Sequence, residues 1–451
     1  MLIAQSLMGL YDKRVECGRG GIGRRAALRS LSGKPGGSSS LLDRTIKFTN
    51  ISRYHIYLDQ FDTGSDYGCW LIDQNWHSYQ CKSHKFKYLI IEGSYLSMFF
   101  FKCIVGVIFV FLLASCSPAD QLPGKPWHHT TEGFRNPPGS PKRNDWIKRV
   151  SWYIEKPFQA IFGEKAKISK NHVLKRNKAL EDIEKAFGKN TVTWLGHMTA
   201  LLQIDGKVIL TDPWFTSYAT PLPPFGPKRY VAPALKLNDL PKVDFIVISH
   251  NHFDHLDLAT ITNIPNKKEI TAIVPLGISE YFRDAGYEHV VELDWEETIT
   301  LRKIKFTALP AIHWSKRSAF YKNDTLWASW AIRGESGVSV YFGGDAEYGP
   351  IYADIGKRHG DFDLSLLSVG AFLPRIVMRG AHCIPEECIK IGADMKARNH
   401  LAMGWGTVRL GDERDEDTVR RFKSGAKKLG IRDENVWIMK IGETRMIPTK
   451  W

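Results

Sequence analysis

Cysteine is scarce in this sequence, with only seven among 451 residues. Three of them, Cys116, Cys383 and Cys388, lie beyond residue 115. Cys383 and Cys388 are five residues apart on an expected helix, a spacing that suits neither a disulfide nor a Cys-x-x-Cys metal site. The sequence therefore predicts a fold that is held together without a disulfide framework.

An array of Arg and Lys interleaved with aromatic residues is also absent, which argues against a nucleic-acid-binding surface. The formal net charge is nevertheless +14. Residues 1–97 contribute +5 of this charge, Lys102 adds one, and +8 remains beyond Cys116. We expect most of this charge to form a solvated basic face, so no nucleic acid is predicted as a partner.

The apolar segment at residues 98–115 is too short for a confident membrane span and fits the core of a signal peptide. It ends in Leu-Ala-Ser before Cys116, which resembles the lipobox of bacterial lipoproteins, where the cysteine carries the lipid after cleavage. The sequence therefore predicts a lipoprotein anchored to a membrane of the bacterial cell envelope, on the periplasmic face of the outer membrane. The alternative is an ordinary buried helix or an N-terminal anchor.

Signal peptides act from the N-terminus, yet this one begins at Met98. Residues 1–97 contain GGIGRRAALRS followed by GGSSSLLDRTI, which resembles the translation of a leucine tRNA gene. We therefore expect residues 1–97 to be a non-native extension and translation to start at Met98. A genuine N-terminal region is the alternative.

Residues 116–190 are expected to form a tether followed by N-terminal helices. Residues 116–143 are rich in Pro, Gly and polar residues, which predicts a linker. Apolar residues at helical spacing predict helices over residues 145–162 and 172–187.

A pattern of strands begins at Thr191. The segments Thr191–Ile204 and Lys207–Leu210 flank Asp205-Gly206, a dipeptide that favours a two-residue hairpin turn. The apolar run Val243–Ser249 predicts a buried strand. Further strands are expected at Ile304–Leu309 and Val338–Phe342, and helices at residues 276–285 and 385–396. This alternation predicts a single α/β domain over residues 191–451.

Four residues of the kind that bind metals follow the buried strand within six positions: His250, His252, Asp254 and His255. A loop at the carboxyl end of a strand can turn such side chains toward one point. Imidazole and carboxylate together suit zinc, with iron or manganese as alternatives. The cluster therefore predicts a metal site.

Two further residues of this kind follow other expected strands. His313 comes after Ile304–Leu309, and Asp345 comes after Val338–Phe342 through two glycines. Because these strands should belong to one sheet, both side chains are expected at the metal site. A carboxylate at a strand end is also suited to bridge two cations.

The motif His-x-His-x-Asp-His, followed by a strand-end His and a later Gly-Asp, resembles the metallo-β-lactamase superfamily. More narrowly, the chain is similar to the group of phospholipases D that hydrolyse N-acylphosphatidylethanolamine. The similar stretches cover about residues 190–410, among them TWLGHMTALLQIDG, LTDPWF, VISHNHFDHLD, PAIHWSKR, GGDAEYGP and HCIPEE. This resemblance implies an αββα four-layer sandwich over residues 191–451 and a metal-dependent phosphodiesterase.

The resemblance also implies roles for single residues. One cation, expected to be zinc, would bind to His250, His252 and His313. A second would bind to Asp254 and His255, and Asp345 would bridge the two ions. Asp212 would not bind the ion itself but would orient one of its ligands. His382 would lie near the phosphate of the substrate. Asp254, Asp345 and His382 are thus the expected catalytic residues, and the membrane phospholipid is the expected substrate.

One position departs from the family. The last metal-binding histidine of the family lies in a motif His-Trp-Gly-Thr, and this sequence has Gly404-Trp405-Gly406-Thr407. His400 is at the other end of the expected strand and is a poor substitute, since a strand rises about 3.3 Å per residue. The second zinc ion is therefore in doubt, and the centre holds one ion or two.

Two other functions compete with phospholipid hydrolysis. A hydrolase of another ester, lactone or nucleotide phosphodiester is possible because this scaffold changes substrate through its loops. The aromatic residues Trp214, Phe215 and Trp314 fit an apolar substrate, although they are equally suited to packing. A non-enzymatic lipoprotein that binds metal is the third reading, motivated by Gly404.

Overall fold

The computed structural model describes residues 120–143, 148, 150–152, 155, 171–318 and 321–449, together with the backbone of four strands nearer the N-terminus. The chain divides into two compact units, Met1–Ser117 and Pro118–Trp451. The expected signal peptide at 98–115 and Cys116 lie outside the described residues. Within the described residues, no helix has both the length and the apolar character needed to cross a bilayer.

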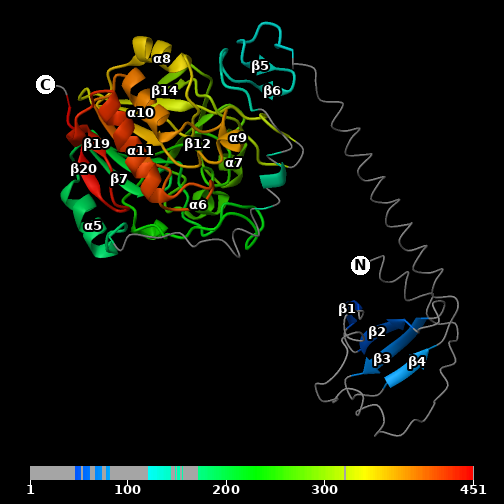
Figure 1. Ribbon diagram of the computed structural model, residues 1–451. Coiled ribbons are helices and arrows are strands. Elements are labelled where there is room, and N and C mark those ends of the chain that lie inside the picture. Colours follow the sequence, from blue (N-terminus) through cyan, green and yellow to red (C-terminus); the bar gives the residue numbers. More distant parts are fainter. Residues whose placement is uncertain are drawn as a thin grey trace. The chain divides into compact units, whose positions relative to one another are not determined.

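The first unit contains an antiparallel four-stranded sheet with the strand order β1-β2-β3-β4 (Figure 1). Its strands are β1 (Ile46–Ile51), β2 (Tyr54–Gln60), β3 (Tyr67–Asp73) and β4 (Ser78–Cys81). The prediction of a non-native extension falls on this unit and stays a prediction.

The second unit is built on two seven-stranded sheets. The first has the order β12-β11-β10-β9-β8-β7-β20. Its strands are β7 (Thr191–Gly196), β8 (Thr199–Ile204), β9 (Lys207–Thr211), β10 (Phe245–Val247), β11 (Thr271–Pro275), β12 (His289–Leu293) and β20 (Thr444–Met446). The expected hairpin turn is present between β8 and β9, where Asp205 and Gly206 both have positive φ.

The second sheet has the order β13-β14-β15-β16-β17-β18-β19. Its strands are β13 (Thr298–Leu301), β14 (Ile304–Leu309), β15 (Ser329–Gly334), β16 (Ser339–Phe342), β17 (Leu364–Ser368), β18 (Asn399–Met403) and β19 (Val436–Trp437). The strands β16, β17 and β18 are parallel to one another.

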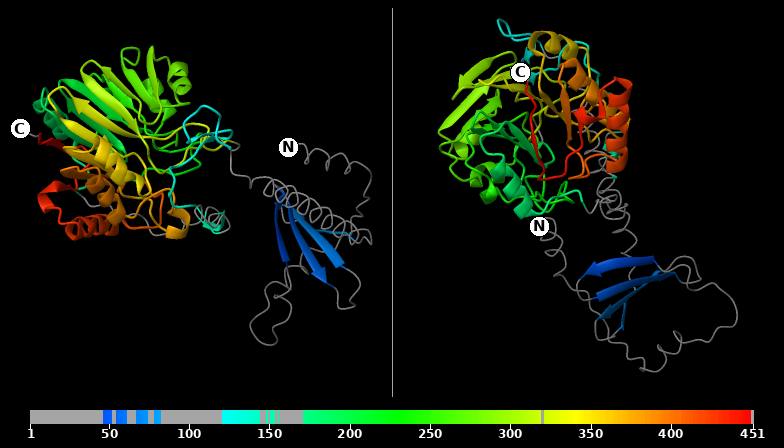
Figure 2. Two further views of the ribbon diagram at one scale, coloured as in Figure 1. Left: turned by 90° about the horizontal axis from the view of Figure 1, so that it is seen from above. Right: turned by 90° about the vertical axis from the view of Figure 1, so that its left-hand side faces the viewer.

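The two sheets pack face to face, and helices cover their outer faces (Figure 2). One apolar core joins residues of both sheets, such as Phe245 and Phe306, whose rings are 5.0 Å apart. A second core lies between the outer face of the second sheet and its helices. The helices are α5 (Arg176–Lys185), α6 (Leu258–Asn263), α7 (Ser279–Asp284), α8 (Ile351–His359), α9 (Arg375–Met378), α10 (Pro385–Asp394) and α11 (Asp415–Lys428). The predicted four-layer αββα sandwich is confirmed.

The prediction of a linker at residues 116–143 is wrong for the described residues 120–143. They include the short pair β5 (His129–Thr130) and β6 (Gly133–Phe134), and hydrogen bonds join them to the rest of the second unit. Asn136 exchanges two hydrogen bonds with the backbone of His313, at 2.7 and 3.0 Å. The segment is an ordered loop, because the side chain of Asn136 bonds to backbone outside the segment and the backbone N–H of Phe134 donates to the carbonyl of Asn323.

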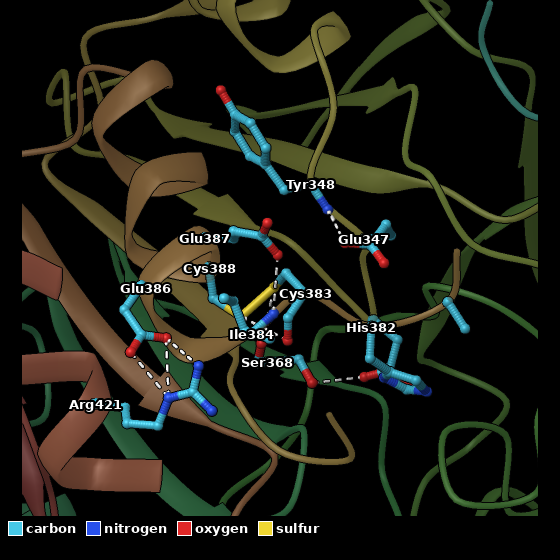
Figure 3. The surroundings of a disulfide bond; sticks show 12 residues. Glu347, Tyr348, Ser368, His382, Cys383, Ile384, Glu386, Glu387, Cys388 and Arg421 are labelled. Carbon is cyan, nitrogen blue, oxygen red and sulfur yellow. Dashed lines mark hydrogen bonds and ion pairs between the residues drawn. A yellow bond between two sulfur atoms is a disulfide. The ribbon is translucent and has the colours of Figure 1, made fainter. Parts of the chain in front are cut away.

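The prediction that Cys383 and Cys388 are unpaired is also wrong. The two residues form a disulfide with their Cα atoms 5.5 Å apart (Figure 3). The error came from placing both residues on one helix. Since α10 begins at Pro385, Cys383 precedes the helix and its side chain can turn back toward the first helical turns.

Candidate metal centre

The site lies where strands of both sheets end. In the first sheet β7, β9 and β10 run in the same direction, because β8 is antiparallel to both β7 and β9, and β9 is parallel to β10. Their carboxyl ends therefore lie at one edge, followed by His197, Asp212 and the run from His250 to His255. In the second sheet β14 and β16 also run in one direction, and they lead to His313 and Asp345. The ends of five strands thus supply one cluster.

The first half of the centre consists of His250, His252 and His313. The Nε2 atom of His250 is 2.6 Å from Nδ1 of His252, which is 3.3 Å from Nε2 of His313. Ligand atoms bound tetrahedrally to zinc at about 2.0–2.1 Å lie roughly 3.3 Å apart. The three nitrogen atoms therefore converge as ligands of a single ion would.

The second half consists of Asp254, His255 and His197. The Nε2 atom of His255 lies 3.6 Å from Oδ2 of Asp254, and Oδ2 of Asp254 lies 2.9 Å from Nε2 of His197. These three side chains also form a group whose ligand atoms are close enough to hold an ion. His197 has no role in the sequence-based prediction.

Asp345 lies between the two halves. Its Oδ2 atom is 3.1 Å from Nε2 of His255 and 4.0 Å from Nε2 of His313. Gly344 permits this position, because a Cβ atom there would lie 2.6 Å from the Cβ of Ser249. The small residue lets the end of β16 approach the end of β10 closely.

Hydrogen bonds behind the cluster fix the orientation of the rings. His255 donates from Nδ1 to Asp212 at 2.7 Å, and Asp212 also accepts the backbone N–H of Ser249 at 2.7 Å. His313 donates from Nδ1 to the carbonyl of Ala381 at 2.8 Å. Both rings therefore keep Nε2 for the centre, which is how metal-binding histidines are commonly oriented. Asp212 thus accepts a hydrogen bond from a candidate ligand, and its orienting role stays a prediction.

The two halves differ in charge. Burial lowers the pKa of His250 and His313 well below the ordinary value and that of His252 to about 3. Burial also opposes the charged form of His255, but Asp345 and Asp254 raise its pKa well above the ordinary value. The first half is thus a set of neutral imidazoles, and the second contains paired opposite charges.

The donor atoms fit a cation of the zinc type. Neutral imidazole nitrogens and carboxylate oxygens are the ligands that zinc takes in catalytic sites. The Nε2 atom of His255 is buried and makes no hydrogen bond with a described residue, although two carboxylates lie beside it. An ion between these groups would satisfy all of them.

Gly404 follows β18 at the same edge, with φ of +71°. His400 lies at the start of that strand, buried, with Nδ1 2.9 Å from Oγ of Ser365. It is absent from every group of described residues that could hold a metal ion.

The predicted substrate contacts border the first half. Nδ1 of His382 lies 3.8 Å from Oδ2 of Asp345, and its ring packs edge-on against His313 at 5.2 Å. Trp314 is half-buried, and its ring lies 4.4 Å from that of His252. The guanidinium of Arg143 lies 4.4 Å from the centroid of the Trp314 ring.

Two aromatic residues considered for an apolar substrate differ. Trp214 is fully buried and packs against Arg229 at 4.0 Å, so it belongs to the core. Phe215 is half-buried against that core.

Sequence-based reasoning missed His197, Asn136 and Arg143. The sequence pattern predicts one strand over Thr191–Ile204, which hides His197, whereas a turn at His197 divides β7 from β8. The dipeptide Gly196-His197 was the available signal for a turn. Asn136 and Arg143 were hidden inside the presumed linker.

A family model described as the beta-lactamase superfamily domain matches residues 207–405. An uncharacterised protein of Mycobacterium tuberculosis is 37% identical over 241 residues, which are 52% of this chain and 64% of that protein. The N-acyl-phosphatidylethanolamine-hydrolyzing phospholipase D 1 of Caenorhabditis elegans is 38% identical over 236 residues, 49% of this chain and 64% of that protein. The mitochondrial enzyme of the same description from Saccharomyces cerevisiae is 34% identical over 247 residues, 53% of each chain. The chain thus spans 53–64% of the length of these relatives.

Proposed function

We propose that residues 207–405, which match the model of the beta-lactamase superfamily domain, belong to a metal-dependent hydrolase of phosphodiesters, of the phospholipase D type. The substrate is a lipid like N-acylphosphatidylethanolamine, as the names of two relatives suggest. The position of Asp345 carries the proposal, because its carboxylate faces ligand-type residues of both halves.

The side chains of the centre would hold the cation, which is proposed to be zinc. Bound there, zinc would supply a water whose pKa is lowered from near 16 to about 7. His250, His252 and His313 present neutral nitrogens at neutral pH, so no proton has to leave them first. Asp345 would hold the two halves at a fixed separation.

Where the centre holds a single ion, Asp254 is proposed to receive the proton of the attacking water. Burial raises the pKa of its carboxyl, but His255 and His197 lower it further, so the net pKa is below the ordinary value and the group is ionised. An ionised carboxylate at the centre can accept a proton as a general base.

The phosphate of the substrate is proposed to bind beside His382, Arg143 and Trp314. His382 is next to Asp345, and the charge of Arg143 acts on His382. A cation and an imidazole donor on one side of the centre suit a phosphodiester oxygen, because charged donors bind phosphate strongly.

A cavity of about 570 Å³ is proposed to receive apolar chains of the substrate. Its walls include Phe253, which lies between two residues of the metal motif, and Pro221, Pro223 and Leu258. Arg317 lies on the same wall, with its guanidinium 4.3 Å from the ring of Phe253. Apolar walls with a few polar groups are typical of sites for small molecules.

The location of the protein is proposed from the sequence. A lipid on Cys116 would anchor the domain to the bacterial outer membrane, on its periplasmic face. Such an anchor would raise the effective concentration of a phospholipid substrate.

The test is an assay of purified, zinc-loaded protein against N-acylphosphatidylethanolamine in mixed micelles. The expected products are an N-acylethanolamine and a phosphatidic acid. Water-soluble carboxylic esters, a lactone and a nucleotide phosphodiester serve as comparison substrates. If the protein hydrolyses any of these but not the lipid, the proposed phospholipid hydrolysis is wrong and the centre has another hydrolytic activity. A protein that binds metal and hydrolyses none of them would contradict the proposed function.

A further inference from the structure

We propose that His197 supplies the imidazole of the second half of the metal centre, in place of a side chain at position 404. This proposal rests on the proposed function only in that it assumes a two-part metal centre. It assigns a ligand on the turn between β7 and β8, far in the sequence from the end of β18.

The topology brings His197 to the centre. It follows β7, which runs in the same direction as β9 and β10 and ends at the same edge of the sheet. Its φ is +50°, a conformation that residues other than glycine rarely adopt. Such strain persists where the surrounding structure fixes it, and it is frequent at functional sites.

The distances around His197 fit a shared ion. Nε2 of His197 lies 2.9 Å from Oδ2 of Asp254. The same oxygen lies 3.6 Å from Nε2 of His255. That nitrogen is 3.1 Å from Oδ2 of Asp345. All three separations are close to the roughly 3.3 Å expected between tetrahedral ligands of zinc. Two imidazoles and two carboxylates would complete the coordination.

The ring of His197 is held for this role and is not satisfied by the protein alone. Only 2% of the residue is exposed, and the ring packs edge-on against the rings of His255 and Trp214, both at 5.2 Å. Its Nδ1 atom is buried and makes no hydrogen bond with a described residue. Its Nε2 atom, 2.9 Å from Oδ2 of Asp254, is therefore the nitrogen that would face the ion.

Position 404 is adjacent but blocked. The backbone N–H of Gly404 donates to the carbonyl of His197 at 3.0 Å, so the two positions lie side by side. A Cβ atom at 404 would lie 2.7 Å from Oγ of Ser368 and 3.2 Å from Sδ of Met198. Ser368 in turn donates to Asp345 at 2.7 Å. A side chain at 404 would have to displace Ser368, whereas His197 reaches Asp254 without displacing any group.

The competing role for His197 is a hydrogen bond that orients Asp254. Substitution by glutamine separates the two roles, because an amide can donate to a carboxylate but is a poor ligand for zinc. A ligand role predicts that His197→Gln and His197→Ala both lose the second ion. An orienting role predicts that His197→Gln keeps it.

The experiment measures zinc per chain by mass spectrometry, and zinc affinity by titration calorimetry, on the full-length protein stripped of metal. We expect two ions for the unaltered protein and one for each His197 variant. The dissociation constant of the second ion should rise at least about 100-fold, since even hydrogen-bond partners of ligands are worth 10–100-fold. The ion retained in the first half shows that the variants are folded.

His400→Gln is the matched control, since it removes a buried histidine outside the centre and should leave two ions. Two ions at unchanged affinity in His197→Gln would overturn the assignment of His197. One ion in both the unaltered protein and His197→Ala would also overturn it. No bound zinc in the unaltered protein would overturn the proposed function itself.

Discussion

The two halves of the candidate metal centre are built from similar residues but in different ways. His250, His252 and His313 are three neutral rings from two loops. The second half combines His197 and His255 with two carboxylates, and its residues come from three strand ends. The first half can bind a cation as it stands. The second holds its own opposite charges together, so an ion must replace a proton there.

This contrast explains why the sequence motif is a better guide to the first half. His250 and His252 are fixed by one loop and need only one further strand end. The second half depends on which residue of a neighbouring loop reaches Asp254, and a motif cannot show this. Four substitutions test the contrast, from the largest expected effect to the smallest.

Asp345→Ala should affect both halves, because its carboxylate faces both. We expect the affinity for both ions to fall at least about 100-fold, and hydrolysis to be lost with it. Titration calorimetry with zinc measures both affinities. Unchanged affinity for either ion would show that Asp345 does not lie between two ions.

His252→Ala should empty the first half alone. Nδ1 of His252 lies between the nitrogens of His250 and His313, so its loss leaves only two imidazoles there. We expect loss of one ion per chain and of hydrolysis, measured by metal analysis and by release of product. Full metal content in this variant would show that the assignment of the first half is wrong.

Asp212→Asn should weaken the second half without emptying it. The substitution replaces the carboxylate that accepts the hydrogen bond from Nδ1 of His255. Partners of this kind are worth about 10–100-fold in metal affinity. Zinc titration should show that loss for the second ion and a smaller one for the first. An equal loss for both ions would mean that the two halves are not independent.

His400→Gln should leave both halves intact and change only the response to acid. Burial lowers the pKa of His400 to about 4, so the unfolded chain binds a proton below pH 6.5 while the folded chain does not. The contribution of neutral His400 to the free energy of unfolding is therefore present above pH 6.5 and is lost as the pH falls toward 4. The loss between pH 7 and pH 5 is about 2 kcal/mol.

Urea denaturation at pH 7 and pH 5 measures that loss. The unaltered protein should lose about 2 kcal/mol more free energy of unfolding than the variant over this interval. Equal losses in the two proteins would show that His400 does not titrate as a buried neutral residue.

Much of the fold was predictable from local patterns. The strand at Ile304–Leu309 was predicted with the bounds that the structure gives, and the Asp205-Gly206 turn was predicted correctly. The four-layer sandwich was implied by the resemblance to a family, whereas the strand and helix pattern itself predicted an α/β domain. These features depend on residues close in the sequence, where hydrophobic period and turn chemistry decide the conformation.

Other features depended on contacts that no local pattern contains. Residues 120–143 are ordered because Asn136 forms hydrogen bonds with the backbone of His313, 177 positions away. The pairing of Cys383 with Cys388 depends on where α10 begins. Both errors concern the bounds of an element or the partner of a loop, which local propensity specifies weakly.

The sequence by itself determined the residues that could bind metal and the edge of the sheet at which they would gather. Six of them, all named from the motif and the strand ends, lie together in the structure, and their role as ligands stays a prediction: His250, His252, Asp254, His255, His313 and Asp345. Only the tertiary structure decided which further side chain lies beside these residues, because Gly404 has no side chain. A strand end fixes a side chain near an edge, but the approach of separate loops decides which atoms meet, and there His197 lies 2.9 Å from Asp254.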